Sequence, residues 1–286
     1  MKHLYIKDII KSVQNEKIKD AVVRRQRKNP DYKDSVFVEG KRVIETALMS
    51  TAIPQRVFIT PEFLNNMANQ SLIEKISQKC ADIYEVSEPV MNKLSDTESP
   101  QGIAALFKIT ECNLLNLNPC SESVYIILDG ISEPGNVGTI VRTAEAFGIS
   151  GAIMLPGTAD PFSTKGVRAS AGCVFNISTT KTTADEFLKW INHTKLTLIS
   201  TVVSGGVPLY ETPLKPPFAL IFGQESEGIS RVLINNSTVK VMIPMHGKAE
   251  SINVSVSAAI CLYEMLRQRQ LNASLDCLNP VPLKKS

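Results

Sequence analysis

Five short, largely apolar runs in the second half of the chain constrain its fold more than any other feature. They occupy residues 124–128, 151–155, 196–203, 218–222 and 239–243, and most end in glycine or polar residues. Runs of this length that do not alternate are typical of strands buried on both faces of a parallel sheet. Helical periodicity fits between them at about 138–148, 183–193 and 251–270. This half is therefore predicted to be an α/β fold with a mostly parallel sheet and helices on both faces, which binds ligands beyond the carboxyl ends of its strands.

The first half shows a different alternation of helix and strand. Apolar residues follow a helical period over residues 8–28, and Asn29-Pro30 ends that helix. Strands are expected at 36–38, 56–60, 83–86 and 104–109, with helices at about 40–50, 70–80 and 88–95, which predicts a small α/β sandwich. Residues 110–122 lose periodicity. The predicted organisation is a domain at 1–112, a linker at 113–122, a second domain at 123–272 and a tail at 273–286.

Composition excludes several classes of protein. The 286 residues suffice for two domains, 43% of them are hydrophobic, and no run approaches the ~18 apolar residues of a membrane span. Charge interrupts the first residues too early for a signal-peptide core, so we expect a cytoplasmic protein that does not enter a membrane. Six cysteines and three histidines form no zinc-binding spacing, so we expect no metal and reduced thiols.

The N-terminal segment carries most of the positive charge. Residues 1–34 hold ten Lys or Arg against five Asp or Glu, whereas the remaining residues sum to −2. Such a segment attracts a phosphate backbone, which makes Arg24, Arg25, Arg27 and Lys28 candidate RNA-binding residues. A solvated helix face is an equally good explanation of this stretch taken alone.

Three loops that follow apolar strands carry unusual polar and glycine-rich sequences. They read DGISEPGNVGTIVRTA at 129–144, FGQESEGI at 222–229 and IPMHGKAESINVSVSAA at 243–259. Each alone has a structural explanation, as a turn, a carboxylate favoured at a helix N-terminus, or a helix cap. The glycine spacing of the first loop is not the dinucleotide-binding fingerprint, so a nicotinamide-dependent enzyme lacks its main signal.

Taken together and in this order, the three motifs resemble the SpoU (TrmH) family of RNA ribose methyltransferases over about residues 123–270. The resemblance implies a SPOUT fold with a deep trefoil knot, S-adenosylmethionine as cofactor, and a homodimer whose partner chain completes the active site. Upstream, VFVEG at 36–40 and SPQGIAA at 99–105 resemble the ribosomal-protein-like, RNA-binding substrate domain that often precedes this catalytic domain.

The resemblance also assigns roles to individual positions. Gly223, Ile243 and Ile252 match residues whose backbone holds the cofactor, although leucine is usual where Ile252 stands. The glycine-rich turn at 204–206 follows a strand, and we interpret it as either a pocket wall, with Gly205 beside the cofactor, or a plain turn. The positions that match the catalytic and RNA-contacting set are Asn136, Arg142, Glu225, Ser251 and Asn253.

The reaction that the resemblance implies is attack of a ribose 2′-hydroxyl on the sulfonium methyl group. The family's proposed base matches Arg142, but a guanidinium stays protonated in proteins, which favours a role as a clamp for the target phosphate. Glu225 or Asn253 then orients the hydroxyl. Ribosomal RNA is the expected substrate; transfer RNA, or RNA binding without turnover on the same fold, are the alternatives. The sequence does not identify the nucleotide.

Overall fold

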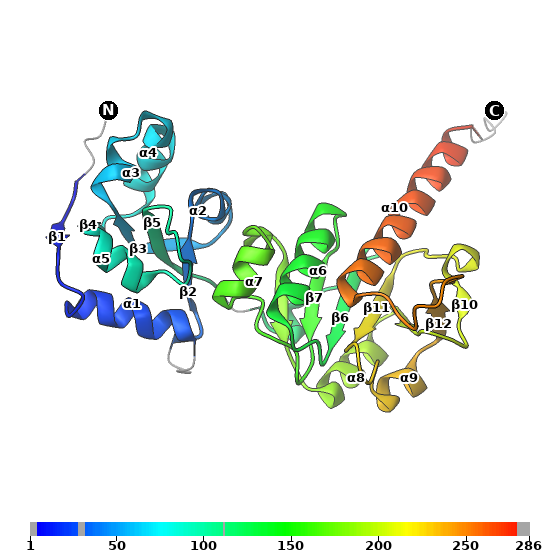
Figure 1. The fold of residues 1–286 in the computed structure, drawn as a ribbon. Helices are drawn as coiled ribbons and strands as arrows, with labels where there is room; N and C mark the ends of the chain where they lie inside the picture. Colours follow the sequence, from blue (N-terminus) through cyan, green and yellow to red (C-terminus); the bar gives the residue numbers. More distant parts are fainter. Residues whose placement is uncertain (1–4, 28–31, 111, 279–286) are drawn as a thin grey trace, which may run out of the picture. The chain divides into compact units, whose positions relative to one another are not determined.

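The computed structural model describes residues 5–27, 32–110 and 112–278, with side chains as far as Leu271. It contains one five-stranded and one seven-stranded sheet (Figure 1). Contacts divide the chain into two compact units, one of residues 1–112, 133–142 and 159–179 and the other of 113–132, 143–158 and 180–286. The domain bounds predicted above stay a prediction, and residues 279–286 of the predicted tail lie outside the described residues.

The five-stranded sheet has the order β1 (Asp8–Ile10), β4 (Ile83–Val86), β3 (Ile53–Ile59), β5 (Ile103–Lys108) and β2 (Ser35–Glu39). The first three strands are parallel, and β5 is antiparallel to both of its neighbours. Helices α1 (Glu16–Gln26) and α5 (Glu88–Leu94) contact each other, as do α2 (Lys41–Met49) and α4 (Gln70–Lys79). Buried residues of α1 and α5 share one apolar core with Phe37, Phe58 and Tyr84 from three of the strands.

The helix predicted over residues 8–28 is wrong at its start. Residues 8–10 form β1 instead, where Ile9 is 54% exposed and Ile10 only 2% exposed, as expected for neighbours on opposite faces of a strand. The helix begins at Glu16 because the Asn15 side chain accepts a hydrogen bond from the Lys17 amide. It ends where Arg27 adopts a left-handed conformation with φ 48°.

The seven-stranded sheet has the order β10 (Val207–Pro208), β12 (Val239–Met242), β9 (Thr197–Thr201), β11 (Phe218–Gly223), β6 (Val124–Asp129), β7 (Gly151–Met154) and β8 (Ser178–Lys181). Successive pairs from β10 to β7 are parallel. The five predicted runs are all strands, and their central members, such as Ile127 and Ile221, are fully buried. The predicted parallel α/β class is therefore confirmed.

Five α-helices follow or connect these strands: α6 (Pro134–Ala146), α7 (Thr164–Ala169), α8 (Ala184–His193), α9 (Arg231–Asn236) and α10 (Val254–Leu278). In Figure 1, α8 and α9 lie side by side on one face of the sheet and α10 lies on the other. The prediction for the last helix, 251–270, is wrong at both ends. Residues 251–253 precede α10, and Asn253 accepts a hydrogen bond from the Ser255 amide as a helix cap does.

The apolar character of α10 does not make it a membrane span. Within the described ranges, no helix combines the length and hydropathy that crossing a bilayer requires.

Candidate active site

A cavity of about 300 Å³ opens at the carboxyl ends of β9, β11 and β12, in the unit that contains the seven-stranded sheet. This is the edge at which parallel sheets bind their ligands. Its walls come from the ends of the three strands, the loop after β11, the segment after β12 and the start of α10. The lining residues are Thr201, Val202, Val203, Phe222, Gly223, Gln224, Glu225, Ser226, Glu227, Gly228, Val241, Met242, Ile243, Met245, Ser251, Ile252, Val254, Ser257 and Cys261.

The structure brings together five of the predicted site residues in this one cavity. Gly223 is the last residue of β11 and Glu225 lies in the loop after it, whereas Ile243, Ser251 and Ile252 come from the segment between β12 and α10. The second and third sequence motifs therefore both contribute residues to the lining of this cavity. Their individual roles in binding or catalysis stay predictions.

The last residue of β11, Gly223, lies so close to the backbone of the following loop that it must be glycine. The Gly228 amide donates to the Gln224 carbonyl at 2.9 Å, and this hydrogen bond holds the two ends of the loop close together. A Cβ atom on Gly223 would lie 2.2 Å from the Gly228 carbonyl carbon, closer than any real contact allows. Backbone groups can therefore approach a ligand at Gly223 without a side chain between them.

Asp129, the last residue of β6, holds the C-terminal end of this loop. Its Oδ2 atom accepts a hydrogen bond of 2.7 Å from the Ser230 amide, and Asp129 pairs with Gly223 in the register of β6 and β11. Asp129 is the first residue of the first motif, and the motif alone indicates no role for it. Its place directly after a buried strand, ahead of a glycine, was the available signal.

Glu225 and Asn253 form a polar pair beside the cavity. The Asn253 Nδ2 atom donates to Glu225 Oε1 at 3.0 Å. The Asn253 Oδ1 atom accepts from the Ser255 amide at 2.9 Å and from the Ser255 hydroxyl at 2.6 Å. These three bonds fix which end of the amide faces the carboxylate. Both residues are exposed, so the pair is accessible to a substrate.

The two predicted residues of the first motif lie on α6, within the stretch 133–142 that belongs to the other compact unit. Arg142 is exposed and Asn136 is partly buried. The motif loop itself is held by Thr158, a residue outside all three motifs. The Gly130 amide donates to the Thr158 hydroxyl at 3.1 Å, and that hydroxyl donates to the Leu128 carbonyl at 2.7 Å. The roles of Asn136 and Arg142 stay predictions.

Gly205 is not among the residues that line the cavity. It is exposed and has φ +73°, a conformation that favours glycine in a turn. The three residues that end at Val203, just before this turn, do line the cavity. The cofactor contact predicted for Gly205 stays a prediction.

The predicted RNA-binding arginines in α1 and at its C-terminal cap make contacts within the protein. Arg24 pairs with Asp20 at 2.9 Å and lies over the Tyr32 ring, and Arg25 donates to the carbonyls of Leu94 and Ser95. The side chain of Arg27 is 10% exposed; it pairs with Asp160 at 2.7 Å and donates to the Ser35 and Lys33 carbonyls. These contacts occupy donors that a phosphate would need. Lys28 lies outside the described residues, and RNA binding by this segment stays a prediction.

Cys261 lies in the wall of the cavity, but it is not an acid or a base. Burial raises the pKa of its thiol to about 12. The thiol therefore stays protonated at neutral pH and presents a small apolar surface to a ligand.

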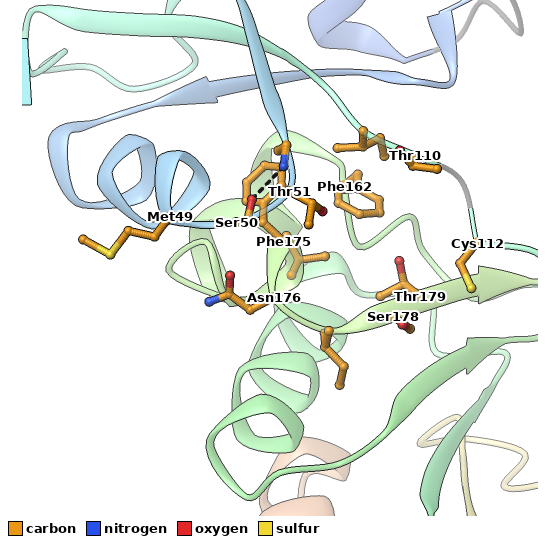
Figure 2. Close-up of a pocket in the computed structure, with 14 residues that line it drawn as sticks. Met49, Ser50, Thr51, Thr110, Cys112, Phe162, Phe175, Asn176, Ser178 and Thr179 are labelled. Carbon is orange, nitrogen blue, oxygen red and sulfur yellow. Dashed lines mark hydrogen bonds between the residues drawn. The ribbon is translucent and has the colours of Figure 1, made fainter. Parts of the chain in front are cut away.

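A second cavity, of about 490 Å³, lies in the other unit and contains none of the predicted site residues. Figure 2 shows the Phe162 and Phe175 rings in its wall, with the hydroxyl-bearing Ser178 and Thr179 nearby. Among the described residues no charged side chain lines it, and burial raises the pKa of the Cys112 thiol. Within the described residues no cluster of three or more His, Cys, Asp or Glu could hold a metal ion.

Comparison with known proteins identifies the class. Residues 123–263 match the SpoU rRNA Methylase family, and residues 15–105 match the MRM3-like substrate binding domain. The chain is 31% identical to the 23S rRNA (guanosine-2′-O-)-methyltransferase RlmB of Coxiella burnetii, over 78% of this chain and 92% of that protein. This chain belongs to the SpoU (TrmH) family, as its three motifs predicted.

Other relatives extend the likeness over nearly the whole chain. The 23S rRNA (guanosine(2553)-2′-O)-methyltransferase RlmP of Bacillus subtilis is 28% identical over 90% of this chain and 98% of its own length. The crystal structure of an AdoMet-bound rRNA methyltransferase from Sinorhizobium meliloti superposes with a TM-score of 0.82 at 28% identity. That match covers 92% of this chain and 98% of the other.

Proposed function

We propose that this chain transfers a methyl group from S-adenosylmethionine to a ribose 2′-hydroxyl of ribosomal RNA. The observation that carries the proposal is the cavity at the strand ends, which the second and third family motifs build together, with the Glu225–Asn253 pair beside it. The relatives named above are ribosomal RNA methyltransferases, two of them named for guanosine 2′-O-methylation, and one relative was crystallised with the same cofactor.

The cavity fits the proposed cofactor in its chemistry. Backbone amides and carbonyls at Gly223, Ile243 and Ile252 are suited to the edge of a purine, and Phe222, Val202 and Val254 supply apolar walls for its faces. A side chain at position 223 is excluded by Gly228, which keeps that backbone accessible. When bound, S-adenosylmethionine supplies an electrophilic methyl group with a good leaving group.

The residues of the chain then need to hold the nucleophile in line and accept its proton. Glu225 is a carboxylate that accepts hydrogen bonds only, so a ribose hydroxyl can donate to it. Asn253 holds that carboxylate in one orientation through its 3.0 Å hydrogen bond. Positioning of this kind supplies a large part of the rate enhancement in reactions with two bound partners.

Arg142 is proposed to bind the phosphate next to the target ribose. Its guanidinium is a planar cation with five donors, which suits a phosphate. The side chain is exposed on α6. Ser251, which lines the cavity, and Asn136 complete the proposed set of residues that contact cofactor or RNA.

The working protein is proposed to be a homodimer. Helix α10 exposes four large apolar side chains, Val256, Ile260, Tyr263 and Leu271, at spacings of three to four residues or multiples of them. Such a stripe, left open to water, supports burial against another copy of the chain. We also propose that the chain forms the trefoil knot of this fold. The protein is proposed to act in the cytoplasm, where ribosomal RNA is modified.

Incubation with tritiated S-adenosylmethionine and unmodified ribosomal RNA tests this function. We expect labelled RNA from ribosomal transcripts and none from transfer RNA. Cofactor binding measured by calorimetry without transfer to any RNA would instead favour an RNA-binding protein on the same fold. Label found only in transfer RNA would overturn the choice of substrate.

A further inference from the structure

Asp129 does not line the cavity at the strand ends, but it is held firmly beside the loop of residues 224–230. It is the last residue of β6 and pairs with Gly223, the last residue of β11, in the parallel register. Leu128 before it is fully buried, and the Leu128 carbonyl accepts a hydrogen bond of 2.7 Å from the Thr158 hydroxyl. The backbone that carries the Asp129 carboxylate is therefore rigid.

The loop of residues 224–230 is exposed along most of its length. Residues 225–228 are all exposed, and only Ile229, near the end of the loop, is buried. The hydrogen bond from the Gly228 amide to the Gln224 carbonyl shapes the loop, but it joins two parts of the loop to each other. A segment with so little buried surface opens at a low cost in free energy. Bonds to other elements therefore decide how often this loop is closed.

One hydrogen bond near each end ties the loop to another element. Near its start, Glu225 Oε1 accepts from Asn253 Nδ2 at 3.0 Å. At its end, the Ser230 amide donates to Asp129 Oδ2 at 2.7 Å. A short hydrogen bond from a backbone amide to a carboxylate is stronger than one between neutral groups. The bond to Asp129 is therefore well suited to keep the end of the loop in place.

The part of the loop that Asp129 holds also forms the wall of the cavity. Residues 223–228 all line it. Gly228 is two residues before Ser230 and lies directly against Gly223, where an added Cβ atom would be 2.2 Å from the Gly228 carbonyl carbon. Release of the Ser230 amide would let Gly228 move away from Gly223 and would change the shape of this wall. Asp129 can therefore affect a ligand in the cavity without contacting it.

We propose that Asp129 is a positioning residue for the proposed methyl transfer, because its bond to the Ser230 amide keeps residues 224–230 in the closed arrangement that binds S-adenosylmethionine. If the cofactor binds only when the loop is closed, its apparent dissociation constant is the intrinsic constant divided by the fraction of closed molecules. Loss of the bond lowers that fraction and weakens binding. The inference rests on the proposed function for the identity of the ligand.

Two substitutions break this hydrogen bond from opposite sides. Asp129→Ala removes the acceptor, and Ser230→Pro removes the amide donor at a residue whose φ of −57° is close to the value that proline requires. Asp129→Asn is the conservative variant, because it keeps an acceptor oxygen. The matched control is Thr183→Ala, which removes the acceptor of the Glu186 amide in the same compact unit, at a residue that does not line the cavity.

Three measurements on the full chain test the inference. Calorimetric titration with S-adenosylmethionine gives the dissociation constant without RNA. Steady-state transfer of label to unmodified ribosomal RNA gives kcat, the KM for the cofactor and the KM for RNA. Hydrogen exchange, read by mass spectrometry in the cofactor-free protein, reports how often the peptide that contains residues 224–230 opens.

Asp129→Ala and Ser230→Pro are each expected to raise the dissociation constant for the cofactor about tenfold, the effect of losing one hydrogen bond to a charged group. The double variant is no weaker than either single variant, because both changes remove the same bond. Asp129→Asn recovers affinity to within about threefold of the unmodified protein, the effect of a neutral acceptor in place of a charged one.

The kinetics separate positioning from a general loss of stability. Bound cofactor itself closes the loop, so at saturating cofactor the kcat of Asp129→Ala stays within about twofold of the unmodified protein and the KM for RNA is unchanged. The loop peptide of this variant exchanges faster. Thr183→Ala unfolds at a lower temperature because it loses a helix cap, but it keeps normal affinity for the cofactor.

Cofactor affinity within twofold of the unmodified protein in Asp129→Ala, in a preparation that still transfers label, would overturn the inference and leave the proposed function intact. A double variant whose loss is the product of the two single losses would also overturn it, because the residues would then act independently. If Asp129→Ala does not fold, Ser230→Pro and Asp129→Asn decide in its place. Failure of the proposed function gives a different pattern: the unmodified chain would not transfer label, while hydrogen exchange would still show whether Asp129 holds the loop.

Discussion

Asn253 and Glu225 lie 28 residues apart in the chain and are joined by a hydrogen bond of 3.0 Å between Nδ2 and Oε1. This bond connects the loop after β11 to the start of α10. The same asparagine caps α10 through its other side-chain atom, Oδ1. One residue therefore links a carboxylate beside the cavity to the N-terminus of the longest helix, and its two functions can be separated by substitution.

Asn253→Asp is expected to lower kcat by at least about tenfold while the protein stays folded. Aspartate keeps the acceptor that caps α10 but replaces the donor to Glu225 with a second carboxylate, which repels it. The matched control is Asn235→Asp on α9, an exposed position away from the cavity, which should keep full activity. Steady-state kinetics and circular dichroism measure the two effects. Unchanged kcat in Asn253→Asp would contradict the role of the pair.

Gly223→Ala is expected to abolish detectable cofactor binding, because its Cβ atom would overlap the Gly228 backbone at 2.2 Å and force the loop open. Gly148→Ala is the control. A Cβ atom there meets nothing within 4 Å, although φ +69° makes it cost about 1 kcal/mol of stability. Calorimetric titration with S-adenosylmethionine should find normal affinity in the control. Normal affinity in Gly223→Ala would mean that the loop does not hold the cofactor.

Arg142→Lys is expected to retain part of the activity, and Arg142→Ala to lose about a hundredfold or more in kcat/KM. A lysine keeps the charge that attracts a phosphate but loses the planar pair of donors. Full activity of the lysine variant would remove any special role for the guanidinium. Activity near normal in the alanine variant would show that Arg142 neither clamps the phosphate nor takes part in proton transfer.

The cysteines should differ in their reaction with iodoacetamide as pH rises. The hydrogen bond from the Ser123 hydroxyl lowers the pKa of the exposed Cys120 thiol, whereas burial raises the pKa of Cys261 to about 12. Because the thiolate reacts and forms above the pKa, Cys120 should be alkylated first at pH 7–8 and Cys261 should stay protected. Peptide mass spectrometry measures both rates. Early labelling of Cys261 would show that the cavity wall is open.

Ile260→Glu should convert the proposed dimer into monomers, because it places a charge in the exposed apolar stripe of α10. Val232→Glu, at a 43% exposed position on α9, is the control and should leave the oligomeric state unchanged. Light scattering after gel filtration gives the mass of each. A monomeric unmodified protein with full activity would contradict the proposed dimer.

The sequence predicted the parallel sheet well because its strands are buried on both faces, which produces short apolar runs, such as 124–128, that end at turn residues. Short elements were missed, although their caps were present in the sequence. Thr60 caps α3 (Pro61–Asn65), with proline at its first position, and Ser163 caps α7. The adjacent pair Ile9 and Ile10 fits a helix and a strand equally well, and only pairing with β4 decides between them.

The candidate site was predictable as a set of positions but not as a set of contacts. The motifs pointed to Glu225, Ser251 and Asn253, yet the start of α10 after Asn253 depends on a side-chain cap that was taken for helix interior. Asp129 and Thr158 hold the motif loops through backbone partners far away in sequence. The spacing of residues along one sequence does not indicate hydrogen bonds between positions so far apart. The roles of Asp129 and Thr158 therefore became visible only in the structure.

The position of the transferred methyl group is the most direct test of methylation at a ribose 2′-hydroxyl. Unmodified ribosomal RNA is incubated with the protein and isotopically labelled S-adenosylmethionine, digested to nucleosides and analysed by mass spectrometry. We expect one labelled nucleoside whose added mass stays with the ribose when the glycosidic bond is broken. Label that stays with the base would contradict it.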